Sequence, residues 1–210
     1  LLDNNGGAAT PTDYSDDTVV NGTLGFGATV GTLTLVSIKD RGALPLLATD
    51  DVTYLGVALD DFAGDLVGLE SVLEFHAYGV DAVLNKVSSG VLVIPAADKL
   101  DWSTFTSTGL DLSAAQAALN GTTLGALTDS VDLAIDGSVV LNVLSGVLVA
   151  KGDFTIALGQ VQSALLPSGV SADADAMVLT LSNVGVFVGV GGALLDNNGG
   201  AATPTDYSDD

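Results

Sequence analysis

The stretch that decides the fold class is VDLAIDGSVVLNVLSGVLVAKGDFTIALGQV, residues 131–161. It divides into four short pieces, with a glycine near each break, at Gly137, Gly146, Gly152 and Gly159. Short strands at such regular spacing predict an antiparallel meander, sandwich or barrel, and the rungs of a β-solenoid have a similar spacing.

Most of the remaining chain also has strand character. Val, Thr and Leu dominate, whereas the helix-forming residues Glu, Lys and Arg are scarce. We predict further strands within residues 18–38, 51–62, 72–87, 91–95 and, as a pair, 176–195.

One segment, DLSAAQAALNG at residues 111–121, has helical spacing instead. Its apolar residues Leu112, Ala115 and Leu119 fall on one helical face, Ser113 is a candidate N-cap, and Asn120 precedes a glycine that would end the helix. The predicted fold is therefore mainly β: an antiparallel β-sandwich, or a meander or solenoid-like repeat unit, with one short helix near residues 112–119. Trp102 is expected to anchor the core.

Composition limits the partners. The chain has 26 acidic and five basic residues, a formal net charge of −21, which argues against nucleic-acid binding because such binders neutralise phosphate with Lys and Arg. No run of eighteen apolar residues is present, so we predict no membrane insertion. The chain has no Cys, which excludes disulfides and thiol chemistry. It begins with Leu1 and shows no signal peptide, so we expect an excerpt or a processed product.

The two ends of the sequence are identical. LLDNNGGAATPTDYSDD occupies residues 1–17 and again residues 194–210, an offset of 193. We interpret residues 1–17 as an acidic inter-repeat loop, 18–193 as a β-rich repeat unit and 194–210 as the start of the next repeat. The favoured explanation is a tandem array with a 193-residue period. A duplicated terminal segment that links subunits, or a boundary without structural meaning, would also produce identical ends.

Two acidic stretches are candidate calcium loops, because calcium binds six to eight oxygens in irregular geometry. The alternative for both is a solvated acidic loop with Asx turns. In the duplicated segment the candidate ligands are Asp3, Asn5, Asp13, Asp16 and Asp17, with their copies Asp196, Asn198, Asp206, Asp209 and Asp210. In the second stretch they are Asp40, Asp50 and Asp51. Calcium is the only cofactor that we expect.

No pattern favours catalysis. His76 is the only histidine, and we interpret it as a hydrogen-bonded histidine within a strand rather than as a metal ligand. Glu70 and Glu74 form a poor glycosidase pair because only Phe75 and Tyr78 lie near them as an aromatic platform. No nucleophile elbow or phosphate-binding loop is present. We therefore predict that the protein is not an enzyme.

The segments DNNGGAATPTDYSDDTVVNGTLGFGATVGTLTLV and LATDDVTYLGV resemble the tandem repeats of very large secreted bacterial surface proteins of the adhesin type. The resemblance implies export, an extracellular or cell-surface location, a role in a fibre or stalk, and calcium between modules. Together with the copy at residues 196–210 it covers just under a third of the chain, and the calcium-binding nonapeptide repeat of toxin-type proteins is absent.

The leading functional hypothesis is a structural repeat unit of an extracellular filament or cell-surface fibre that assembles head-to-tail with copies of itself. An interface that does not close into a ring produces an open filament. The alternative is a calcium-dependent adhesin module that binds carbohydrate or another surface. A secreted hydrolase is a third, weaker possibility.

Overall fold

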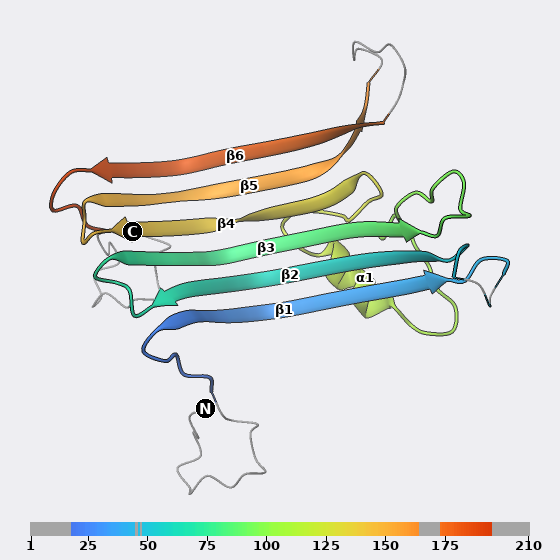
Figure 1. The fold of residues 1–210 in the computed structure, drawn as a ribbon, viewed down its shortest axis with the longest axis horizontal. Coiled ribbons are helices and arrows are strands. Elements are labelled where there is room, and N and C mark those ends of the chain that lie inside the picture. The colour runs from blue at the N-terminus through green and yellow to red at the C-terminus, as the bar shows by residue number, and fades with distance from the viewer. Residues whose placement is uncertain (1–17, 45, 47, 164–172, 195–210) are drawn as a thin grey trace, which may run out of the picture.

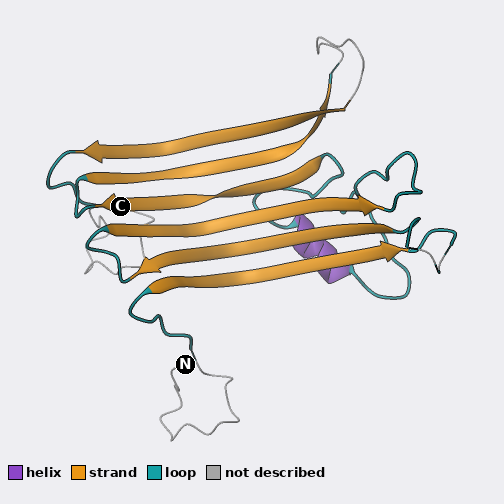
Figure 2. Ribbon diagram, viewed as in Figure 1, coloured by secondary structure: helices purple, strands orange, loops and turns teal. Residues whose placement is uncertain are grey.

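The computed structural model describes residues 18–44, 46, 48–163 and 173–194. Six strands form one antiparallel sheet whose spatial order follows the chain order, so the architecture is an open meander (Figure 1). The single helix of the described residues lies behind this sheet (Figure 2). The mainly β prediction is confirmed in its meander form. In chain order the elements are β1 (Gly25–Asp40), β2 (Val52–Val67), β3 (Leu73–Ser89), α1 (Ser113–Asn120), β4 (Val131–Val143), β5 (Leu148–Gln162) and β6 (Asp173–Val188).

The strands are longer and fewer than predicted. Residues 131–161 form two strands rather than four pieces, because Gly137 and Gly152 stay inside the ladder and pair with Phe154 and Val139. Only Gly146 lies in a turn, next to Leu144 and Ser145. The described residues of 176–195 likewise contain one strand, and residues 91–95 contain none. Glycine weakens a strand without ending it, so neighbouring strands can carry the pairing through it.

α1 packs against one face of the sheet, over β1 and β2 (Figure 2). It begins one residue after its cap position, Leu112, so Ser113 is not the N-cap. Instead, the Asp111 carboxylate accepts the backbone N–H of Ser113 at 2.9 Å. The helix ends at Asn120 as predicted.

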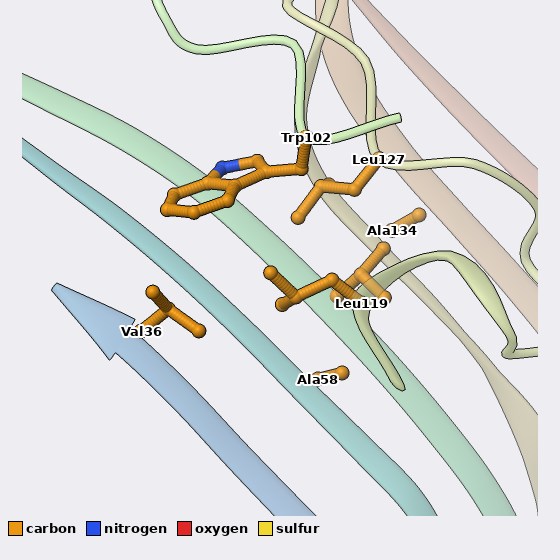
Figure 3. Packing of buried hydrophobic residues seen from close by; sticks show 7 residues of the cluster. Val36, Ala58, Trp102, Leu119, Leu127 and Ala134 are labelled. Atoms are coloured by element: carbon orange, nitrogen blue, oxygen red, sulfur yellow. The ribbon is translucent and has the colours of Figure 1, made fainter. Parts of the chain in front are cut away.

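The hydrophobic core lies between the sheet and the long excursion that joins β3 to β4. Trp102, Leu119 and Leu127 from this excursion are fully buried and pack on small or branched side chains of the strands (Figure 3). The role predicted for Trp102 as a core anchor is confirmed. The strand residues of the cluster are Val36, Ala58, Val83 and Ala134.

Asn85 of β3 holds the excursion through hydrogen bonds that use its whole amide. Its Nδ2 donates to the carbonyl oxygens of Leu100 (2.8 Å) and Thr128 (2.9 Å). Asn120 adds a second link, since its Nδ2 donates to the Trp102 carbonyl and its Oδ1 accepts from Leu127 N. Buried polar groups need such partners, so these two side chains fix the path of the excursion over the sheet.

Candidate functional site

Within the described residues, the excursion between β3 and β4 covers one face of the sheet and leaves the other face uncovered. Residues opposite one another in adjacent strands point to the same side, and successive residues along a strand alternate. β4 pairs with β5 without interruption from Leu133 to Val143, so it serves as a reference for both faces. Ala134, on the even-numbered side of β4, belongs to the core beneath α1 and therefore marks the covered face.

The uncovered face carries two apolar rows that cross all six strands. The strand pairing links Leu35, Val57, Leu84, Leu133, Leu158 and Met177 into one row. It links Leu33, Leu59, Ala82, Ile135, Ile156 and Leu179 into the next. Two shorter rows continue the surface over four strands: Phe75, Leu141, Ala150 and Val186, then Leu73, Val143, Leu148 and Val188.

β-Bulges interrupt the pairing of β2, β3 and β6 near the middle of these strands. Asp61, Gly79 and Asn183 have φ values of 53°, 55° and 52° there, in the left-handed region that Gly, Asn and Asp tolerate best. A bulge adds a residue to one strand and so changes which side the following residues face. In β3 the shift puts Phe75 and Leu73 on the same face as Ala82 and Leu84.

The two edge strands are long and mostly apolar. β1 has no charged residue between Gly25 and Ile38, and β6 has none between Ala176 and Val188. Leu35 is 64% exposed and Met177 is 71% exposed. Edge strands in soluble proteins are normally protected by charge, proline or a covering segment, because their free N–H and C=O groups pair readily with another chain. In the described part of the chain neither edge is paired with a further strand.

Acidic side chains collect on the covered face. Asp81 and Asp136 lie opposite each other on β3 and β4, and the Thr123 hydroxyl contacts both carboxylates. Burial raises the pKa of Asp81, but hydrogen bonds from Asp61 N–H and the Thr123 hydroxyl outweigh it, so this pKa lies below its ordinary value. Burial and then the nearby Asp81 charge raise the pKa of Asp136, although the Thr123 bond opposes them. The proton affinities of the two carboxyl groups therefore differ.

The sheet has two other polar features. His76 Nδ1 lies 2.7 Å from Asp65 Oδ1, which confirms the hydrogen-bonded strand histidine. At the end of the sheet where β3 ends and β4 begins, an open hollow has a volume of about 790 Å³. The polar residues that line it include Asp98, Asp129 and the ion pair of Lys99 with Asp132 (2.6 Å). The His76–Asp65 contact joins β3 to β2, and the Lys99–Asp132 ion pair joins the excursion to β4. We therefore assign structural roles to both contacts.

The candidate calcium ligands of the duplicated segment lie outside the described residues. Of the second set, Asp40 Oδ1 accepts Gly42 N at 3.0 Å and Asp50 Oδ2 accepts Leu44 N at 2.7 Å. Asp51 instead pairs with Lys39 at 2.6 Å. The structure thus brings Asp40 and Asp50 to one turn and directs Asp51 to a lysine. Over the described residues, no group of three or more His, Asp or Glu side chains is arranged to hold a metal ion.

Comparison with known proteins adds no relative. No family model, curated protein or solved structure matches this chain. None of the helices in the described ranges has the length and apolar character needed to cross a membrane.

The uncovered face was not predicted from the sequence. The signal is present in β4, where odd positions from Val131 to Val143 are apolar or glycine and even positions include Asp132, Asp136, Ser138 and Asn142. Recognising the same pattern in β2, β3 and β6 requires the positions of the bulges, which the sequence marks only by single Asp, Gly and Asn residues.

Proposed function

We propose that this chain is a structural repeat unit of an extracellular or cell-surface filament, in which copies join end-to-end with a 193-residue period. In this arrangement β1 of one copy pairs with β6 of the copy before it. The observation that carries the proposal is the pair of apolar edges at opposite sides of one open sheet, neither of them paired within the described residues. Such edges are an aggregation hazard on a lone molecule and an assembly surface in an array.

The polarity of the strands supports this pairing. A meander of six antiparallel strands starts β1 and ends β6 at the same end of the sheet, as Figure 1 shows. A following β1 that starts at that end would run antiparallel to β6 and would continue the meander without a long crossover. The identical segments 1–17 and 194–210 are consistent with one copy leading into the next. Repetition in one direction gives an open filament.

The test uses a synthetic peptide of β1, residues 25–40, as a competitor for the β6 edge. We expect the chain alone to form fibres in negative-stain electron microscopy, and we expect excess peptide to shorten them. A peptide of the same composition in scrambled order is the matched control and should leave the fibres unchanged. A chain that forms no assembly larger than two molecules over a wide concentration range would contradict the proposal.

A further inference from the structure

We infer that the uncovered face of the sheet is the contact surface for a second copy of this chain, which stacks its own uncovered face on the first to complete a β-sandwich. This contact uses the face of the sheet, whereas the proposed filament uses its edges. It therefore adds a lateral interface to that function without depending on it.

The size of the apolar surface supports a partner of protein dimensions. Six strands about 4.8 Å apart, with thirteen residues in β4 at about 3.4 Å each, give a face of roughly 1,300 Å². Monomeric soluble proteins rarely expose an apolar patch above about 600 Å². Two such faces in contact would bury up to about 2,500 Å², which exceeds the roughly 1,200–2,000 Å² of a stable protein interface.

The distribution of charge favours a second copy over other apolar partners. The acidic residues that the pairing places on the covered face include Asp60, Asp65, Glu74, Asp81, Asp132, Asp136 and Asp153. The charged residues that the pairing places on the uncovered face are Lys39, Lys86, Asp173 and Asp175, all near one end of the sheet. Stacking two uncovered faces would keep the covered-face acidic residues of both copies on the outside. A lipid surface would instead meet a chain with a net charge of −21.

The side chains suit the stacking of two sheets. Face-to-face sheets pack about 10 Å apart with their strands rotated by about 30°, and their inner faces consist of alternating apolar residues. Both complete rows of the uncovered face contain only Leu, Ile, Val, Ala and Met. A surface that meets its own copy forms a two-fold symmetric interface, which closes at two copies.

The test compares two lysine substitutions on neighbouring residues of β6. Leu179 lies in an uncovered row opposite Ile156, whereas Thr180 lies opposite Thr155, whose other neighbour is Asp136 on the covered face. Both residues are exposed on an edge strand, so Leu179→Lys and Thr180→Lys alter the edge equally and differ only in the face. Leu33→Lys and Thr32→Lys repeat the comparison on β1, should a β6 variant fail to fold.

The readout is the mass of the smallest stable species in sedimentation equilibrium, with circular dichroism to verify the fold. For Thr180→Lys we expect two chains, twice 20.9 kDa. For Leu179→Lys we expect a single chain, with a dimer dissociation constant raised at least tenfold. A single-chain species for Thr180→Lys, or an intact dimer for Leu179→Lys, would overturn the inference. So would a wild-type monomer that binds phosphatidylcholine vesicles. Failure of the filament proposal has a different signature, a wild-type chain that stops at two copies.

Discussion

Trp102 Nε1 donates a hydrogen bond to Asn85 Oδ1 at 3.1 Å, and both side chains are almost wholly excluded from solvent. The indole belongs to the excursion over the sheet and the amide belongs to β3, so this bond ties the two layers together. Asn85 also donates hydrogen bonds to two backbone carbonyls of the excursion, those of Leu100 and Thr128. A polar residue at the centre of an apolar core thus specifies where the excursion lies.

We expect Asn85→Ala to lower the free energy of unfolding by about 2–4 kcal/mol, because it leaves buried donors and acceptors without partners. Urea unfolding followed by tryptophan fluorescence measures this directly, since Trp102 is the only tryptophan. Ser107→Ala is the control: its hydroxyl makes an exposed hydrogen bond to the Leu110 carbonyl, and its loss should cost under about 0.5 kcal/mol. Equal effects of the two variants would contradict the role assigned to Asn85.

Gly56 provides a steric test of the same core. A Cβ at this position would lie 2.8 Å from Trp102 Cε2 and 3.0 Å from Leu119 Cδ1, closer than packed side chains allow. We expect Gly56→Ala to destabilise the fold by about 1–3 kcal/mol through overpacking.

Gly185 is the matched control for this prediction, because it also lies in a strand but a Cβ added there would meet nothing within 4 Å beyond its chain neighbours. We therefore expect Gly185→Ala to change stability by less than about 0.5 kcal/mol. Thermal unfolding of both variants gives the comparison. A neutral Gly56→Ala variant would mean that the indole packs elsewhere.

The fold class was predictable because alternation in β4 and the composition of the chain both favour strands. The number of strands was not, because Gly137 and Gly152 look like breaks in the sequence but lie within paired strands. Trp102 was recognisable as a core residue from its size and apolar character. Its partner Asn85 was not, because a lone Asn in a strand pattern carries no local sign that its amide meets residues as far away as Thr128.

The candidate sites were also predictable from the sequence only in part. The charge-free runs 25–38 and 176–188 mark β1 and β6 as strands, but that these two form the edges depends on the order of the whole sheet. Lys39, adjacent to Asp40 in sequence, turned out to be the partner of Asp51. Such a pairing depends on the register of β1 against β2, which no spacing within one loop reveals.

The contributions of Asp136 and Asp153 to the stability of the fold are expected to change with pH in opposite directions. Hydrogen bonds from the Ser138 hydroxyl (2.6 Å) and then from Asn183 Nδ2 (2.6 Å) lower the pKa of Asp153 below its ordinary value of 3.8. The folded state therefore favours its ionised form, and this stabilisation is present above pH 3.8 and is lost as the pH falls through the folded pKa. We expect Asp153→Asn to destabilise the chain at pH 7, and we expect this effect to shrink as the pH falls below 3.8.

The pKa of Asp136 is shifted in the opposite direction to that of Asp153. Burial and the charge of Asp81 raise its pKa, so the folded state disfavours the ionised carboxylate, and stability attributable to this group increases as the pH falls through the raised pKa. Asp136→Asn removes one of two like charges that face each other across β3 and β4, for which we expect a gain of about 0.2–1 kcal/mol at pH 7. The gain should vanish in acid, where the wild-type carboxyl is already protonated. Urea unfolding of wild type and both variants at pH 7 and at pH 3 tests the pair. If Asp136→Asn and Asp153→Asn shifted the stability at pH 7 in the same direction, the hydrogen-bond and charge environments assigned to these two carboxylates would be wrong.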